Sequence, residues 1–475
     1  MKRNLVLLVI AAVIALLYFW DVKRQEQKKE LEEKDKEIIA LKQDEVKEIS
    51  IVNKEGTFKA VMDGENWRMV QPFETGGDKS AWDNIARSIT DGQKQRVIDE
   101  NPKDIGVFGL KEPTLQVTVS GVNGATASTL LFGKATPTSG KYYALVKGSS
   151  EVVTVYSSMY TSGDKKLFDL RDKTIVDIDA AKVQRFEVDQ PGLKLKADRK
   201  GEDEWTITEP VLARADSTKI QDMLSKIKNG KIKQFIDEHP DNLAAYELVQ
   251  PATRLVFWTG EKANESSWSS RALLIGCTST TDNVYAMREG QKNVFAIDPK
   301  DLDKVPYDVL SLRMKKISSL RSWDIKNVKV SAASETIFEA TKSSGDWYLL
   351  PKEEGGKLAK AEYSPMMDFV REAVDLEIAQ FLDDATKTAD LSQPVLTIEL
   401  KTDAKSETIA LAGPKPSSDG ISYYFGMRKE PDEVYALNQD KVEKIIQMAH
   451  SVKAEETPTP TPEPEKKAES TPKKE

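Results

Sequence analysis

The residue types that most often carry out chemistry are scarce in this chain. Its 475 residues include two histidines, His239 and His450, and one cysteine, Cys277. A nucleophile needs an activating base, and a zinc site needs several histidine or cysteine ligands. His239 precedes a proline, which is typical of a turn, and His450 lies near the end of an expected helix, where a cation is favourable. We therefore expect no catalytic, cofactor-binding or metal site, and we interpret the protein as a non-enzyme.

Paired carboxylates recur three times, each time at the end of an apolar run. Such pairs can bind Ca²⁺ or act as general acid and base. No D-x-D-x-D-G calcium loop is present, and a feature shared by every copy favours a structural task, such as capping the turn that follows. A cluster of these carboxylates in one pocket would instead indicate a hydrolase, which is the remote alternative. The recurrent acidic positions are Asp99 in RVIDE, Asp237 in QFIDE and Asp383 in QFLDD.

Three tryptophans, Trp67, Trp205 and Trp347, recur 138 and 142 residues apart. Exposed tryptophans could stack on sugar rings and form a glycan-binding surface. Each one, however, lies in the middle of an expected strand and is followed by an amphipathic helix. We therefore expect all three in the repeat cores.

The elements that must position these residues are written three times along the chain. Each copy opens with a strand-like run (46–52, 183–188 and 323–330), and the tryptophan strand follows. A helix comes next, with apolar residues at i, i+3, i+4 and i+7. Strands ending in glycine, a hairpin and a closing helix at 157–169, 299–310 and 438–452 complete each copy. The three helical stripes begin at Trp82, Ile220 and Met366, after start signals at Asp78 or Ser80, at Asp216 and at Ser364 with Pro365.

This pattern predicts an α+β fold, in which an N-terminal transmembrane helix precedes three tandem repeats of about 135 residues. Each repeat is expected to be an antiparallel sheet with a packed helix, in the order β-β-β-α-β-β-β-β-α. The predicted segments are an anchor at 1–20, a charged helical stalk at 21–43, repeats at 44–176, 177–318 and 319–452, and a disordered proline-rich and charged tail at 453–475.

The predicted anchor is an apolar run after two basic residues, and it would place the lipid bilayer among the partners through residues 1–20. A cleaved signal peptide ending at Ala15 is the alternative. The stalk favours a single helix with many ion pairs, although Leu31, Ile38 and Leu41 could form a weak dimerising coiled coil. The residues that define the anchor are Lys2, Arg3, Leu5, Leu8, Ile14, Leu17 and Trp20.

The net charge of −8 argues against a nucleic-acid partner, because phosphate contact needs a basic face. The long soluble remainder favours export, so we expect a single-pass protein of the cell inner membrane whose body is periplasmic or otherwise extracytoplasmic.

The repeated unit resembles the bacterial family catalogued as domain of unknown function 4340, on the segments ENWRMVQP, VFGLKEPTLQVTV and LLFGKATPTSGKYYALV and their counterparts in the second copy. The third copy fits less well, because its interval from Asp383 to Pro394 is shorter. The resemblance implies a membrane-anchored, exported protein that is encoded beside an ABC-type permease and a gliding-motility-like auxiliary protein. It brings no catalytic residues.

Together these observations predict a non-catalytic accessory or scaffold subunit of an ABC-type transport system, which acts through protein–protein contacts at repeat faces or sheet edges. The alternative is an exported module that binds glycan or cell wall. Exposed tryptophans in a cleft would favour that alternative, and buried ones favour the scaffold.

Overall fold

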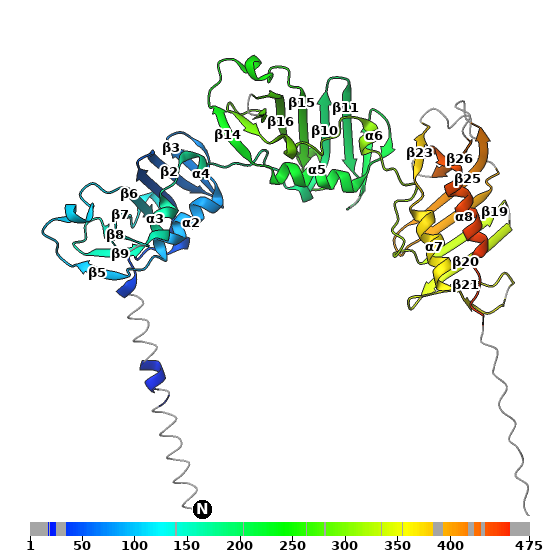
Figure 1. Cartoon of the computed structure of the whole chain (residues 1–475), viewed down its shortest axis with the longest axis horizontal. Helices are drawn as coiled ribbons and strands as arrows, with labels where there is room; N and C mark the ends of the chain where they lie inside the picture. The colour runs from blue at the N-terminus through cyan, green and yellow to red at the C-terminus, as the bar shows by residue number, and fades with distance from the viewer. Residues whose placement is uncertain are drawn as a thin grey trace, which may run out of the picture. The chain divides into compact units, whose positions relative to one another are not determined.

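The structure is a computed structural model. It describes residues 18, 20–24, 35–137, 140–202, 204–262, 264–279, 282–333, 335–353, 355–382, 393–416, 422–428 and 433–456. The main elements are three antiparallel sheets of nine strands each (Figure 1). The chain divides into two compact units, Met1–Ile175 with Lys231–Pro240 and Asn293–Ile297, and Val176–Gly230 with Asp241–Lys292 and Asp298–Glu475.

The first sheet has the strand order β4-β3-β2-β1-β6-β7-β8-β9-β5. Two meanders meet at its centre, where β1 pairs with β6, and β5 closes the far edge against β9. Residues of β1 alternate, with Ile49 and Ile51 buried, because one face of the sheet covers the core. The strands are β1 (Glu48–Asn53), β2 (Gly56–Asp63), β3 (Asn66–Gln71), β4 (Thr75–Gly76), β5 (Arg96–Asp99), β6 (Leu115–Ser120), β7 (Ser128–Ala135), β8 (Lys141–Val146) and β9 (Val152–Tyr156).

The second and third sheets repeat this order strand for strand. The second consists of β10 (Val183–Gln190), β11 (Leu193–Arg199), β12 (Trp205–Glu209), β13 (Ala213–Arg214), β14 (Ile232–Asp237), β15 (Thr253–Thr259), β16 (Ser269–Thr278), β17 (Val284–Arg288) and β18 (Val294–Ile297). The third consists of β19 (Asn327–Ala332), β20 (Glu335–Ser343), β21 (Asp346–Leu349), β22 (Ala359–Lys360), β23 (Ile378–Phe381), β24 (Leu396–Lys401), β25 (Ser406–Pro416), β26 (Ser422–Arg428) and β27 (Glu433–Asn438).

One amphipathic helix follows the fourth strand of each sheet: α2 (Lys79–Thr90), α5 (Ser217–Asn229) and α7 (Tyr363–Val374). Their apolar stripes are buried, as the spacing predicted. Asp78 and Asp216 cap the first two helices by accepting backbone N–H groups, which confirms those start signals. The third helix begins one residue before the predicted Ser364, and its N-cap is Glu362, which makes no side-chain cap bond.

The closing helices differ from the prediction in two repeats. In the first, α3 (Ser157–Gly163) and α4 (Leu167–Leu170) replace a single helix. In the second, the chain forms a short 3₁₀ turn at Pro299–Asp301 and the one-turn α6 (Val309–Leu312). Pro306 lies between them, and proline removes a helical N–H and clashes with the preceding turn. Only α8 (Gln439–Ser451) runs nearly as far as expected.

The predicted fold class is wrong. Each sheet has nine strands rather than seven, and strands outweigh helices throughout the described residues. The predicted order omits the two-residue fourth strand, because a segment this short hardly shows a period of two, and it counts one strand too few after the helix. Across the described parts of the chain, no helix is long and apolar enough to cross a membrane.

Most of the residues on which the anchor and stalk predictions depend lie outside the described residues. Lys2, Arg3, Leu5, Leu8, Ile14 and Leu17 lie outside the described residues, as do Leu31 and the tail from residue 457, while Trp20 is described and exposed. The expected coiled-coil seam is not supported, because Leu41 packs into the core of the first sheet beside Ile39, and Ile38 lies against it. The boundaries given for the repeats stay predictions.

Candidate functional site

The recurrent carboxylates hold turns. Asp99 accepts a hydrogen bond from the backbone N–H of Asn101 at 3.0 Å, and Asp237 accepts one from His239 at 2.9 Å. The two carboxylates end β5 and β14, which belong to different sheets. Asp383 lies outside the described residues. His450 is exposed in the last turn of α8, and Cys277 is half-buried in β16.

The three recurrent tryptophans are buried and present no stacking surface. Trp67 packs at 6.1 Å from Trp82 and donates its Nε1–H to Asp83 at 2.7 Å. Trp347 donates to the sulfur of Met367 at 3.2 Å. Trp205 packs at 5.7 Å from Phe186. Each ring thus joins a tryptophan strand to its core.

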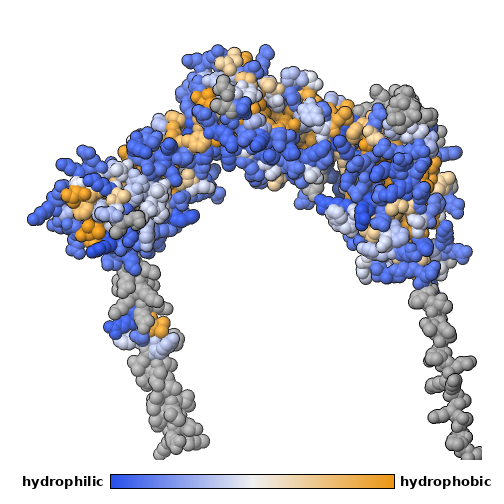
Figure 2. Space-filling view, in the orientation of Figure 1, coloured by the Kyte–Doolittle hydropathy of each residue, from blue (hydrophilic) through white to orange (hydrophobic). Residues whose placement is uncertain are grey.

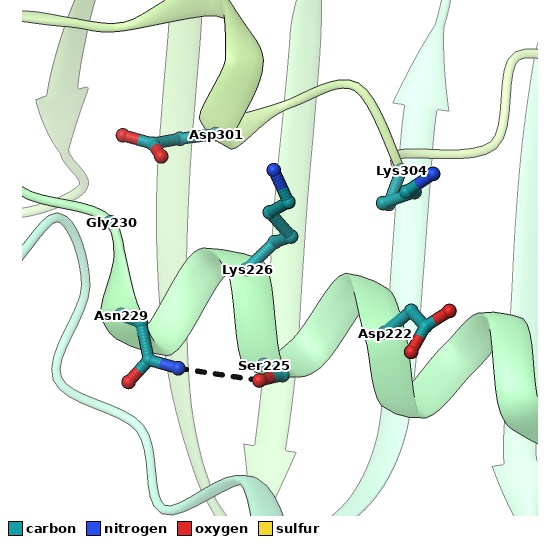
Figure 3. Close-up of a pocket in the computed structure, with 7 residues that line it drawn as sticks. All are labelled: Asp222, Ser225, Lys226, Asn229, Gly230, Asp301 and Lys304. Carbon is teal, nitrogen blue, oxygen red and sulfur yellow. Dashed lines mark hydrogen bonds between the residues drawn. The ribbon is translucent and has the colours of Figure 1, made fainter.

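A hollow of about 460 Å³ lies beside the end of α5 (Figure 3). Lys226 crosses it and interacts with the Lys300 carbonyl at 3.3 Å and with Asp303 at 3.7 Å. Asn229 donates to Ser225 at 3.3 Å along the helix. The charged groups that line it include no nucleophile with an activating base.

A second hollow, of about 410 Å³, lies at the end of α2. It occupies the equivalent place, because Asn84, Asp91 and Gly92 stand where the second repeat has Asp222, Asn229 and Gly230. Glycine alone is kept among the equivalent lining residues, so the hollow recurs while its chemistry does not. Its origin is therefore the way the helix end meets the following segment. No group of three or more metal-ligating side chains occurs in the portion of the chain that was placed.

The most developed polar arrangement surrounds a buried arginine that follows α4 in the chain and contacts β14. Arg171 pairs through its backbone with Gly77, at the edge of the first sheet. Its guanidinium lies 3.4 Å from the ring centre of Phe235 in β14 and forms a two-pronged ion pair with Glu238, whose Oε2 accepts at 3.0 Å. Such planar pairing and stacking suit arginine and not lysine. We call this arrangement the first arginine clasp.

A second arginine clasp is formed by an arginine that follows α6 in the chain and contacts β23. Arg313 pairs through its backbone with Ala215, and its guanidinium lies 3.9 Å from the ring centre of Phe381. Its carboxylate partner is Glu433 of β27, at 3.5 Å, which also accepts the hydroxyl hydrogen of Tyr435. The cation and the aromatic ring are therefore kept, and the carboxylate comes from a different strand.

After each arginine, two residues run along the strand edge and form what we call the strap. The carbonyl of Lys173 accepts the N–H of Ile232 at 2.8 Å, and that of Lys315 accepts the N–H of Ile378 at 2.7 Å. Thr174 then pairs with Lys231, and Lys316 pairs with Glu377. Each strap thus adds a short antiparallel segment to the beginning of β14 or β23.

A further ion pair stands beside the second clasp. Glu407 of β25 accepts from Arg214 at 2.9 Å, from the hydroxyl of Ser318 at 2.6 Å and from both groups of Ser319. Burial alone would raise the pKa of the Glu407 carboxyl, but these hydrogen bonds and the arginine outweigh it and hold the pKa below its usual range. The carboxylate is therefore ionised and fully engaged.

The first sheet has the strap without a described arginine. The carbonyl of Lys36 accepts the N–H of Lys94 at 2.9 Å, and Glu37 pairs with Gln93. Val97 of β5 occupies the place of the two clasp phenylalanines, opposite Val153 as Phe235 is opposite Phe295. The sequence puts Lys34 at the arginine's place, and that residue lies outside the described ones.

The strand β5 itself is exposed. All four residues of β5 are exposed, Val97 and Ile98 at 37% each, and Val107 on the next turn is 63% exposed. Figure 2 shows hydrophobic atoms gathered over this end of the first sheet, where Figure 1 labels β5. We call Val97, Ile98, Asp99, Glu100 and Val107 the β5 surface.

The sequence reasoning missed both clasps. A signal was present, because LRDKTI and LRMKKI stand 142 residues apart, immediately before the second and third repeats. Those segments fall between a predicted closing helix and the next opening strand, and the side chains that hold Arg171 and Arg313 come from later parts of the chain.

Comparisons with known proteins add a family. Residues 67–205 and 205–394 match the family model described as "Domain of unknown function (DUF4340)". No curated protein matches the chain. Among solved structures, the chain is similar to a candidate DNA polymerase III beta subunit from Eubacterium rectale ATCC 33656, with 9% identity, coverage of 84% of this chain and 92% of that one, and a TM-score of 0.13. A likeness that low carries no argument.

Proposed function

We propose that this chain, which belongs to the DUF4340 family, is a non-catalytic scaffold or accessory subunit that works through protein–protein contacts at the cell envelope. Its partner in this proposal is a membrane component of an ABC-type transport system, and its body lies outside the cytoplasm.

The observation that carries the proposal is the β5 surface. In the second and third repeats, the ring at the position of Val97 is covered by the guanidinium of a preceding segment. In the first repeat, three apolar side chains at this place face solvent beside an edge strand. Exposed apolar groups next to a sheet edge are typical of sites that receive another chain.

The fate of the other candidate residues also supports a binding role. Asp99 and Asp237 are engaged in turns, and the tryptophans are buried in the cores. Buried tryptophans weigh against the glycan-binding alternative, because sugar stacking requires an exposed ring face.

The test is cross-linking and affinity purification of the full-length chain from membranes of its native host. We would compare the wild type with a Val97→Asp/Ile98→Asp variant and with Val249→Asp as a matched control, since Val249 is 65% exposed in the second repeat. We expect a permease or ATPase to co-purify with the wild type and the control, and to be lost with the β5 variant.

One outcome would reject the proposed function, and a second would reject the proposed contact site. Retention of the purified protein on cell-wall material, without any co-purifying membrane protein, would favour the ligand-binding module. Equal recovery of the partner with all three proteins would show that the β5 surface is not the contact. Circular dichroism of each variant would establish that the sheets still form, which is expected because the substituted side chains are already exposed.

A further inference from the structure

We propose that the backbone at Met314 and Lys315 is a hinge between the second and third sheets, and that the buried ion pair of Arg214 with Glu407 is a latch that holds this hinge closed. Both β13, which carries Arg214, and the third sheet belong to one compact unit. The hinge and the latch are independent of the β5 surface.

The connection between these two sheets has almost no free length. Met314 donates its N–H to the carbonyl of Arg214 at 3.0 Å, so this residue is still bonded to the edge of the second sheet. The carbonyl of Lys315 already accepts the N–H of Ile378 at 2.7 Å, at the beginning of β23. Two hydrogen-bonded edges are therefore joined by a single peptide unit, and a rotation between the sheets needs only a few backbone angles to change.

The second arginine clasp lies at this hinge. Arg313 pairs through its backbone with Ala215, and its guanidinium packs on Phe381 of β23. Because Arg313 immediately precedes Met314, its contact with the third sheet lies beside the point of rotation. The clasp therefore joins the two sheets at the hinge without fixing the angle between them.

The latch acts away from the hinge. The guanidinium of Arg214 donates to the Glu407 carboxylate at 2.9 Å and to the Ser319 hydroxyl at 3.4 Å. Glu407 belongs to β25, which is three strands away from β23 in the order of the third sheet, or roughly 14 Å at the usual strand spacing. Its side chain is 7% exposed. A buried bond at that distance from the hinge resists rotation better than one beside it.

Few other contacts oppose the rotation. The buried apolar cluster of the third sheet begins at Ile317, and among the described residues it takes in no side chain of the second sheet. A further ion pair joins Glu204, just before β12, to Lys405, whose side chains are 44% and 50% exposed. Exposed pairs contribute little, because water competes for both charges. The buried latch is therefore the contact that sets the angle.

The two latch residues are not part of the repeated pattern. Gly76 stands in the first sheet at the position of Arg214, since each is paired with the tryptophan strand at the same place. Arg271 stands in the second sheet at the position of Glu407. The sheets are therefore built without this cation and this acid at those positions, which indicates that the pair serves the junction.

Acid should open the latch. Arg214 is the charged group that faces Glu407 from β13, β24 presents the uncharged Leu400 opposite it, and the connection presents the hydroxyls of Ser318 and Ser319. Burial would raise the pKa of the Glu407 carboxyl, but the bonds from the serines and the arginine lower it. Opening exposes the carboxyl to water and returns its pKa to the ordinary range. The latch is therefore closed above that range and opens, taking up a proton, as the pH falls through the lowered value.

The experiment measures distances between the sheets in the full-length chain by double electron–electron resonance. Spin labels are placed at Lys228→Cys on α5 and at Lys441→Cys on α8, in a Cys277→Ser background. We expect a narrow distance distribution at neutral pH, and a broader or shifted one at about pH 3. Glu407→Gln should give the broad distribution already at neutral pH, with no further change in acid. A label pair within the third sheet, at Gln380 and Lys441, should keep its distance throughout.

Two further variants sharpen the test. Arg214→Gln removes the latch from the other side and should reproduce the effect of Glu407→Gln. Glu204→Gln is the matched control, because it removes only the exposed pair, and it should leave the distances as in the wild type.

Three results would overturn the inference. A wild-type distribution in both latch variants at neutral pH would show that the angle is fixed elsewhere. Equal broadening with Glu204→Gln would show that any loss of charge at the junction is enough. A changed distance in the label pair within the third sheet would show that Glu407 holds that sheet together and latches nothing.

Discussion

Each of the two arginine clasps pairs a buried guanidinium with a carboxylate, but the two carboxylates come from different places in the repeat. Arg171 lies over Phe235 and pairs with Glu238, whose side chain is 32% exposed. Arg313 lies over Phe381 and pairs with Glu433, which is 9% exposed and bonded to Tyr435. A buried guanidinium requires a stacking surface and a counter-charge, and any carboxylate within reach can supply the latter.

Because Glu433 is more buried than Glu238, removing its arginine should lower the free energy of unfolding by more. Arg313→Ala should be the more damaging change, by about 3–5 kcal/mol, because it leaves the buried carboxylate of Glu433 without its cation. The measurement is hydrogen exchange of the β23 and β27 amides in the full-length protein, with the first-sheet amides as internal control. Exchange rates that change equally for Arg313→Ala and Arg171→Ala would contradict the comparison.

Substitution of Glu407 should weaken the surroundings of the second arginine clasp. Glu407→Ala removes the acceptor shared by Arg214, Ser318 and Ser319, and we expect a loss of about 2–4 kcal/mol, measured by exchange in β25. The first clasp has no equivalent network among the described residues, so exchange in β14 and β18 should not change. An unaltered β25 would show that water replaces these bonds without cost.

The same residue predicts a dependence on pH. The pKa of Glu407 is lower in the folded protein than in the unfolded chain, so its contribution is fully present above the ordinary glutamate range and is lost as the pH falls through the folded value. Asp78 behaves alike near the first clasp. Burial would raise its pKa, but hydrogen bonds from Lys173 and the Ala81 N–H outweigh that and lower it. Acid should therefore destabilise the surroundings of both Glu407 and Asp78. Glu407→Gln should remove the acid dependence around residue 407 and leave that around Asp78. Hydrogen exchange between pH 3 and pH 6 measures both.

Arg171→Ala should cost less, about 1–3 kcal/mol, because Glu238 can be hydrated once the guanidinium is gone. Arg171→Lys is the informative companion. It keeps the charge and loses the planar stack on Phe235, so it should recover only part of the loss. Exchange of the β14 amides measures both variants. Full recovery by lysine would mean that charge alone holds the first clasp.

The contrast between the clasps also shows what the sequence could predict. The stripe that starts at Trp82 and the cap at Asp78 depend on local spacing, and both could be read directly. The edge position of β5 could not, because it depends on pairing with β9 more than 50 residues later. The clasps were missed for the same reason: the partners of Arg313 lie 68 and 120 residues further along the chain. The repeated acids drew attention to Asp99 and Asp237, yet the side chains that hold the arginines are the neighbouring Glu238 and the distant Glu433.

The smallest expected effect tests the counter-charge itself. Tyr435→Phe removes the hydroxyl that binds Glu433 and leaves the ring edge-on to Phe381, with the ring centres 5.9 Å apart. We expect a loss of about 1–1.5 kcal/mol, visible as faster exchange in β27, because a buried carboxylate loses one donor. The first clasp lacks both groups, because Phe295 occupies the position of Tyr435 and Asn293 occupies that of Glu433. Phe295→Tyr should therefore bring no stabilisation, since no carboxylate stands two residues before it. Stabilisation by that change would mean that the hydroxyl acts through the ring environment, and the two clasps would then differ less than their carboxylates suggest.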